Sequence, residues 1–155
     1  GTIIMSVVVI KSETPANVVE RFKHLFHTLD ANNCDSGIIE AVYEPDVLFE
    51  DSFHRIEGVA NFQGYCASLY QNLLSCQFTF HDQWVTDNDA MLNWTMKYAH
   101  PKLNKGRIIT IEGASLIRFN DKVHYHRDYF DGGQLLYEHI PVMGKLIQTL
   151  KYFMK

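Results

Sequence analysis

The run KVHYHRDYFD, at Lys122–Asp131, gathers side chains that could do acid/base chemistry. Its Val, Tyr and Phe residues favour extended backbone, and no Gly or Pro interrupts it, so we predict a β-strand. Because side chains alternate between the faces of a strand, we expect two sets that face opposite ways, namely His124, His126 and Asp128, and Tyr125, Arg127 and Tyr129. If the first face lines a cavity, its imidazoles and carboxylate form a surface that accepts and donates protons.

A second carboxylate, Asp51, lies inside another predicted strand, and His54 follows it closely. Each of these groups also has a purely structural interpretation. Asp128 could pair with Arg127 or a helix terminus, Asp51 could make a turn, and His126 could be a hydrogen-bonded core histidine. Arg127 itself is expected to face away from the cavity and to form an ion pair on the surface.

His124, His126 and Asp128 also resemble a set of metal ligands. Side chains on the same face of one strand seldom converge on one ion without ligands from elsewhere, so we expect neither a metal nor another cofactor. Ser115 and Cys66 lack a recognisable His/Asp partner arrangement in the sequence, which does not favour nucleophilic catalysis.

The composition of the 155-residue chain fits one globular domain, with 46% hydrophobic and 13% aromatic residues. The net charge is -4 and no basic run occurs, which argues against a nucleic-acid binder. The apolar run Ile3–Ile10 is too short to span a membrane. Three cysteines without a C-x-x-C pattern are expected to be free thiols, so we expect a cytoplasmic protein.

Three helices are expected before the main run of strands. The first begins at Thr14-Pro15, with Thr as N-cap and Pro in the first turn. The second is short, begins near Asp35 or Ser36, and ends at Glu44-Pro45-Asp46. The third begins at Gly58. Residues 1–13 form an N-terminal extension, and residues 141–155 form an additional amphipathic helix at the C-terminus.

The strands are expected after, and between, these helices. The first covers Val47–Phe53 and returns through a short hairpin or bend at His54–Gly58. Four long strands follow at about 76–86, 89–100, 107–119 and 122–130, and the short turns between them indicate antiparallel neighbours. Gly113 interrupts the third of these and predicts a bulge or sharp bend.

This order predicts an α+β fold, a cone-shaped barrel in which a strongly bent antiparallel sheet wraps around three helices. Aromatic residues occur on both faces of the long strands, so both faces are expected to be covered. The helices would cover the concave face, and a second copy of the chain would cover part of the convex face. We therefore predict a homodimer formed sheet to sheet.

The arrangement resembles the nuclear transport factor 2-like superfamily, in its SnoaL-like and ketosteroid-isomerase-like branch. The resemblance covers roughly residues 14–131. Three segments carry it: the run YEPDVLFED at 43–51, the return Arg55-Ile56-Glu57-Gly58 into a helix, and the run RFNDKV at 118–123 followed by His126-Arg127-Asp128. This fold serves many functions, so the resemblance supports the fold more strongly than any activity.

The resemblance also implies roles for individual residues. In ketosteroid isomerases the general base is an Asp in a Val-Glu-Asp-Pro-like run, which corresponds to Asp51. Their two enolate-binding donors correspond to Phe22 and Ser115 here, so steroid isomerisation is not expected. In SnoaL-like cyclases the acid/base is an Asp in a His-Trp-Asp-like run on the last strand, which corresponds to Asp128 with His126 two residues before it.

The expected function is that of a small-molecule pocket protein. It could perform cofactor-independent, isomerase- or cyclase-like acid/base chemistry on an apolar carbonyl compound, with Asp128, Asp51 and His126 as catalytic residues. Residues expected to contact the substrate are Tyr43, His54, Trp94, Tyr98 and Ser115. Two carboxylates in one apolar cavity cannot both ionise cheaply, so one is expected to hold its proton near neutral pH.

Two other functions stay open from the sequence. The same cavity could bind an apolar ligand without turnover. Alternatively, the chain could be a protein-interaction module that works through the convex sheet face or the helix Pro141–Lys155.

Overall fold

The computed structural model describes residues 13–130, which form an α+β fold. Within this range there are two α-helices, one 3-10 turn and six strands. The helices are α1 (Pro15–Thr28) and α2 (Val59–Gln71), and the 3-10 turn is η1 (Asn104–Gly106). The strands are β1 (Tyr43–Glu50), β2 (Arg55–Glu57), β3 (Ser75–Val85), β4 (Asp89–Ala99), β5 (Ile109–Phe119) and β6 (Val123–Phe130). The predicted long strands are therefore confirmed to within two residues.

All six strands form one sheet in the order β2-β1-β6-β5-β4-β3. Neighbours pair antiparallel except β1 and β6, which run parallel. The prediction of a wholly antiparallel sheet is therefore wrong, and the sheet is mixed. The short turns between the long strands force antiparallel pairing there, whereas β1 and β6 are far apart in the sequence and no turn sets their relative direction.

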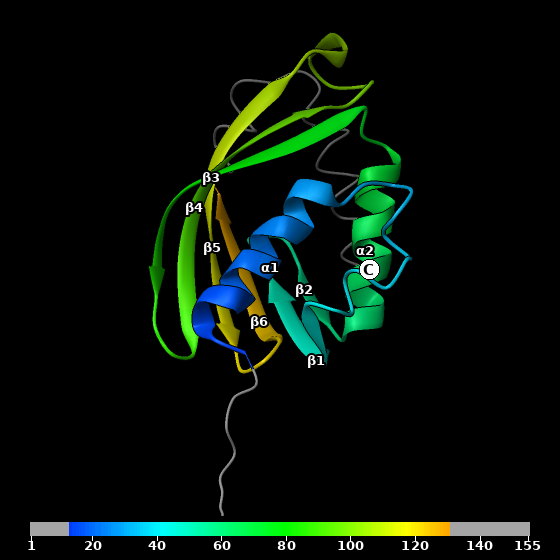
Figure 1. The fold of residues 1–155 in the computed structure, drawn as a ribbon. Coiled ribbons are helices and arrows are strands. Elements are labelled where there is room, and N and C mark those ends of the chain that lie inside the picture. Colours follow the sequence, from blue (N-terminus) through cyan, green and yellow to red (C-terminus); the bar gives the residue numbers. More distant parts are fainter. Residues whose placement is uncertain (1–12, 131–155) are drawn as a thin grey trace, which may run out of the picture.

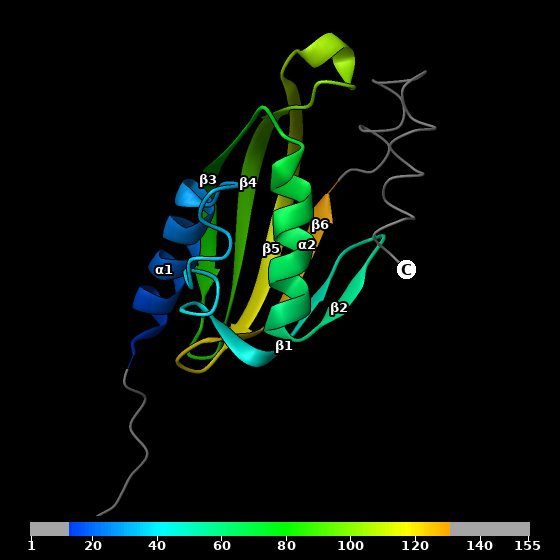
Figure 2. The same ribbon diagram turned by 90° about the vertical axis from the view of Figure 1, so that its right-hand side faces the viewer.

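Both helices lie on the same face of the curved sheet, as Figures 1 and 2 show from two directions. Helix α1 packs on β3, and α2 packs on β1 and β2. Helix α1 begins as predicted, because the Thr14 hydroxyl accepts a hydrogen bond from the Asn17 N–H at 3.2 Å and Pro15 occupies the first turn. Its buried side chains, among them Phe22, form part of the core between helix and sheet.

Helix α2 begins directly after Gly58, as predicted. Gly58 has a φ of 88°, a left-handed conformation that side chains with a Cβ rarely adopt. Its N–H donates to the Val47 carbonyl at 2.7 Å, which fixes the chain reversal from β2 into the helix. The side chains Phe62 and Cys66 then face the core.

The predicted short second helix does not form, and turns occupy residues 31–42 instead. The Asp30 carboxylate accepts hydrogen bonds from the N–H groups of Asn32 and Asn33, at 2.8 and 3.0 Å. Gly37 has a φ of 93°. These local side-chain bonds and the left-handed glycine compete with helix formation. The Glu44-Pro45-Asp46 segment, predicted to end this helix, lies inside β1.

Gly113 does not mark a bulge, which was one of the two predicted alternatives. It pairs with Trp94 of β4 without a register shift. A Cβ at this position would lie 2.4 Å from Cη2 of Trp94 and 2.7 Å from the Tyr129 carbonyl oxygen. The glycine therefore makes room for the indole ring, which lies against the backbone of β5.

The predicted N-terminal extension and C-terminal helix lie outside the described residues. Within residues 13–130 no helix is long and apolar enough to cross a membrane.

Candidate functional site

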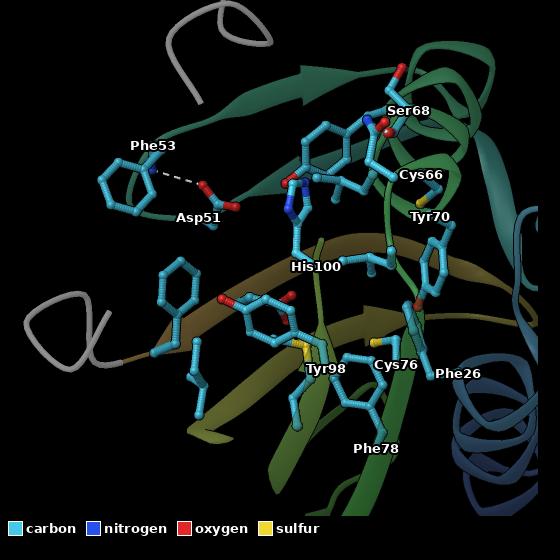
Figure 3. A pocket seen from close by; sticks show the side chains of 18 of the residues that line it. Phe26, Asp51, Phe53, Cys66, Ser68, Tyr70, Cys76, Phe78, Tyr98 and His100 are labelled. Atoms are coloured by element: carbon cyan, nitrogen blue, oxygen red, sulfur yellow. Dashed lines mark hydrogen bonds between the residues drawn. The ribbon is translucent and has the colours of Figure 1, made fainter. Parts of the chain in front are cut away.

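A cavity of about 270 Å³ lies between the two helices and the sheet. Its wall is mostly aromatic and aliphatic, with side chains from α1, α2 and the long strands. Figure 3 shows this pocket with Asp51, Tyr98 and His100 among its labelled lining residues. Asp51 and Asp128 both line it. Both carboxylates therefore line one largely apolar cavity.

The position of Asp128 follows from the pairing of β5 with β6, in which it lies directly opposite Ser115. The Ser115 hydroxyl donates to Asp128 Oδ1 at 2.5 Å. Trp94 Nε1–H donates to Ser115 Oγ at 2.9 Å, from across the strand pair where Gly113 leaves space for the ring. Because the indole can only donate, the single proton of the Ser115 hydroxyl is left for Asp128.

His126 is the second partner of Asp128, and its Nε2 lies 2.6 Å from Asp128 Oδ1. Its other ring nitrogen, Nδ1, lies 2.8 Å from the Tyr43 hydroxyl. Burial is the main cause that raises the pKa of Tyr43 well above its ordinary value, so this hydroxyl stays protonated at neutral pH. The imidazole is 1% exposed and packs edge-on against the rings of Phe22 and Phe49.

These contacts form one consistent set of hydrogen bonds when Asp128 is ionised. Tyr43 donates to Nδ1 of His126, Nε2–H of His126 donates to Asp128 Oδ1, and Ser115 donates to the same oxygen. Asp128 Oδ2 makes no hydrogen bond within residues 13–130. Since Asp128 lines the cavity, Oδ2 is the oxygen available to a bound molecule.

The Ser115–Asp128–His126 sequence of contacts is not that of a nucleophilic triad. The serine hydroxyl contacts a carboxylate, whereas nucleophile activation needs an imidazole that takes the hydroxyl proton.

His124 does not share the inward face of β6, which corrects the predicted alternation. The pairing of β5 with β6 shifts register between Arg118 and Phe119, so His124 is an extra residue in β6. Its side chain is exposed, while Val123 and His126 are buried. Within the described part of the chain, no group of three or more His, Cys, Asp and Glu side chains could hold a metal ion.

The outward set of β6 follows the prediction. Arg127 makes an ion pair with Glu50 of β1 at 3.3 Å, and Tyr125 donates to the same carboxylate at 2.8 Å. The prediction of a surface ion pair for Arg127 is confirmed.

Asp51 lies just after β1 and organises the turn into β2. Its Oδ1 accepts hydrogen bonds from the N–H groups of Phe53 and His54, at 2.8 and 2.7 Å, and lies 3.0 Å from His54 Nδ1 (Figure 3 shows the Phe53 bond). The structural interpretation, that Asp51 makes a turn, therefore holds. Asp51 still lines the cavity, so its charge also acts there.

His54 packs its ring on Tyr65 of α2, with 4.8 Å between ring centroids. Its Nε2 is buried and has no hydrogen-bond partner within residues 13–130. Burial first, and the charge of Asp51 second, raise the pKa of Tyr65 well above its ordinary value. A neutral tyrosine and a carboxylate thus form the wall beside the β1–β2 turn.

The five residues expected to contact substrate divide into two groups. Trp94 and Tyr98 line the cavity. Tyr43, His54 and Ser115 are buried but are not among its lining residues, and each hydrogen-bonds a residue that is: His126, Asp51 and Asp128, respectively. They therefore lie one hydrogen bond behind the cavity wall.

Sequence reasoning missed the segment that follows β4, where His100 and Lys102 line the cavity. Strand parity was the signal that could have found His100, because it lies two residues after Tyr98. Two of the thiols also face the cavity: burial raises the pKa of Cys66, and it raises that of Cys76 to about 11.

Comparison with known structures supports the fold. A candidate SnoaL-like polyketide cyclase from Jannaschia sp. CCS1 is 14% identical, with a TM-score of 0.67 over 83% of this chain and 95% of that chain. A protein with a ketosteroid isomerase-like fold from Catenulispora acidiphila DSM 44928, in complex with trimethylamine, is 12% identical, with a TM-score of 0.68 over 84% and 98%. An LEH-like epoxide hydrolase from M. tuberculosis is 16% identical, with a TM-score of 0.64 over 86% and 94%.

At these identities, the likeness to the three structures is evidence for the fold alone. A search of curated proteins gave no match. The sequence model of the SnoaL-like domain matches residues 19–125, which is more than half of the chain and contains most of α1 and all of α2 and β1 to β5. The predicted resemblance is therefore confirmed, and the chain belongs to the SnoaL-like family, with an NTF2-like, ketosteroid isomerase-like fold.

Proposed function

We propose that the protein binds a small apolar carbonyl compound and moves a proton on it, with Asp128 as the general base. The observation that carries this proposal is the hydrogen-bond chain from Tyr43 through His126 to Asp128 Oδ1, which leaves Oδ2 to the cavity. A base that is held in place by the protein on one oxygen can accept a proton on the other without reorganisation of its surroundings.

In the proposed reaction, Asp128 Oδ2 takes a proton from a carbon next to the substrate carbonyl. The electron pair of the broken C–H bond forms a carbon–carbon double bond, and the carbonyl π pair moves to oxygen. The proton then returns from Asp128 to the same or another carbon, so no cofactor is required. His126 keeps Asp128 oriented through its Nε2 contact with Oδ1.

The test uses 2-tetralone, an apolar bicyclic ketone, in D₂O. Wild-type protein should speed deuterium incorporation next to the carbonyl, measured by NMR after the buffer rate is subtracted. Asp128→Asn should lower this rate by roughly 100-fold or more while the ketone still binds, because Asn keeps the shape but loses the base.

Asp51→Asn is the matched control, since Asp51 lines the same cavity but its Oδ1 is held by the turn. We expect a much smaller loss of exchange in that variant. Equal exchange rates in wild type and Asp128→Asn would remove Asp128 from the mechanism.

Binding without turnover is the second candidate, and the largely apolar cavity wall favours it. It predicts saturable binding of 2-tetralone with no deuterium incorporation above the buffer rate. The same experiment therefore separates the two functions.

We further propose that the protein acts as a homodimer that pairs through the outer face of the sheet. The support is the sheet face opposite the helices, which neither α1 nor α2 covers (Figure 2).

A further inference from the structure

One end of the cavity is lined by hydrogen-bond donors that the proposed proton transfer does not use. They come from the end of β4 and the segment after it: Tyr98, His100 and Lys102 all line the cavity. Figure 3 labels Tyr98 and His100 among the side chains that line the pocket. Asp128 lies elsewhere along the sheet, because it is level with Leu92 of β4, six residues before Tyr98.

The Tyr98 hydroxyl is a donor without a partner. The residue is 7% exposed, yet its hydroxyl makes no hydrogen bond within residues 13–130. Burial raises the pKa of Tyr98 to about 12, so the hydroxyl keeps its proton at neutral pH. The hydroxyl can therefore donate to an oxygen of a ligand in the cavity.

His100 is held as a neutral donor by its own backbone turn. Its Nδ1 accepts a hydrogen bond from the Lys102 N–H at 3.0 Å, which leaves the ring proton on Nε2. Burial and then the Lys102 charge lower the pKa of His100, so the neutral ring dominates at pH 7. The Nε2–H group makes no hydrogen bond within the described residues.

Lys102 adds a positive charge to this end of the cavity. The residue is exposed, and its ammonium group forms no ion pair within residues 13–130. A hydroxyl, an imidazole N–H and an ammonium group share one property: all three can donate, and within residues 13–130 none of these three groups donates to a protein acceptor. Such a set suits an anionic oxygen better than a neutral one.

We propose that Tyr98, His100 and Lys102 form a subsite that binds a carboxylate group of the ligand. The ligand class is then an apolar ring acid whose carboxylate lies at this subsite while its hydrophobic body fills the aromatic cavity. The inference rests on the proposed small-molecule pocket, but it does not depend on proton transfer at Asp128.

The probes are three compounds of matched shape: 2-naphthoate, 2-naphthamide and 2-methylnaphthalene. Their affinities for the full chain are measured by calorimetry or ligand fluorescence at pH 7. We expect 2-naphthoate to bind roughly 10-fold tighter than the two neutral compounds, which is the size of one charge-assisted hydrogen bond near a surface. Equal affinities for the three probes would overturn the inference.

Each donor has a variant and a matched control. Lys102→Met should remove most of the preference for 2-naphthoate, whereas Lys105→Met, in the same loop but outside the cavity lining, should keep it. Tyr98→Phe should lower the affinity for 2-naphthoate several-fold and leave the affinity for 2-methylnaphthalene unchanged. Tyr70 also lines the cavity, but its hydroxyl already has a hydrogen-bond partner in Cys76. Tyr70→Phe should therefore change the affinities for both probes by the same factor.

The two nitrogens of His100 can be tested separately. His100→Asn retains an acceptor near the Nδ1 position for the Lys102 N–H but removes the Nε2 donor. It should therefore lower the affinity for 2-naphthoate. His100→Gln places an amide N–H near the Nε2 position and should restore part of the affinity. If both variants bind 2-naphthoate like wild type, His100 is not part of the subsite.

These measurements separate the inference from the proposed function. Asp128→Asn should keep the preference for 2-naphthoate over 2-naphthamide, because it leaves the donors Tyr98, His100 and Lys102 unchanged. If the protein prefers the carboxylate probe but does not catalyse exchange in the ketone, the subsite is supported and proton transfer is refuted. If exchange depends on Asp128 but the carboxylate probe is not preferred, proton transfer is supported and the subsite is refuted.

Discussion

At the scale of single residues, Asp128 differs from Asp51 in how its oxygens are used. Both line the cavity. Asp51 accepts hydrogen bonds from two backbone N–H groups of a turn, and both of its oxygens contact His54 Nδ1, whereas the hydrogen bonds of Asp128 within residues 13–130, with Ser115 and His126, all use Oδ1. Backbone donors fix a chain reversal. Asp128 keeps Oδ2 for a bound molecule, so we expect it to be the better base.

Tyr43 sets the tautomer of His126 in this arrangement, which leads to a testable prediction. In Tyr43→Phe the buried Nδ1 loses its donor, so the protein should lose about 1–3 kcal/mol of unfolding free energy in urea. Deuterium exchange into 2-tetralone should also fall, because the imidazole is no longer held with its proton on Nε2.

Tyr125→Phe provides the control for that variant. Tyr125 donates to Glu50 on the outer face of the sheet, outside the cavity. It should change stability by less than about 0.5 kcal/mol, as surface substitutions usually do, and leave exchange unchanged. Equal effects of the two variants would show that the Tyr43–His126 contact has no special role.

At the scale of the elements, the pairing of β4, β5 and β6 places the site. Gly113 lies opposite Trp94, Ser115 lies opposite Asp128, and the indole N–H reaches the serine two residues along β5. The glycine is therefore part of the site, although it carries no side chain, because it admits the ring that orients Ser115.

Gly113→Ala should destabilise the protein by about 1–3 kcal/mol, since a Cβ would overlap the Trp94 ring and the Tyr129 carbonyl. Denaturation in urea measures this loss, and 2-tetralone exchange should fall with it as Trp94 moves away from Ser115.

Gly64→Ala, within α2, is the opposite case. An added Cβ there meets nothing within 4 Å, so the helix should gain about 0.5–1 kcal/mol. Similar stabilities for the two alanine variants would contradict the packing described for Trp94.

At the scale of the whole molecule, the helices cover one face of the sheet and leave the other open within residues 13–130 (Figures 1 and 2). Polar side chains cross this outer face in a hydrogen-bonded row, from His81 through Thr95 to Glu112. Trp84 and Tyr129 are 60% and 44% exposed. Because these polar side chains are already hydrogen-bonded to one another, a second copy of the chain could cover this face and leave those bonds intact.

We expect a dimer at micromolar concentration in light scattering. Thr95→Arg places a charge in a central strand of the outer face and should give a monomer that still unfolds cooperatively. Asn61→Arg, on the exposed side of α2, should remain a dimer. A monomeric wild-type protein would refute the sheet-to-sheet arrangement.

The sequence alone determined the elements whose signals are local. Thr14-Pro15 marked the start of α1, Gly58 marked the start of α2, and the turn residues between the long strands set their lengths and their antiparallel pairing. These features depend on neighbours within a few residues, so the local sequence is enough to predict them. The runs around Asp51 and Asp128 also sufficed to indicate the family, which the match over residues 19–125 confirms.

Only the tertiary structure decided features that depend on residues far apart in the chain. The parallel pairing of β1 with β6, the extra residue His124 in β6 and the packing of Trp94 on Gly113 are all set by neighbouring strands. The same is true of the site: His126 meets Tyr43, and Ser115 meets Asp128, across strands whose register no local pattern specifies. Strand alternation assigns a face to a side chain, but the partner on that face is chosen by the pairing of the sheet.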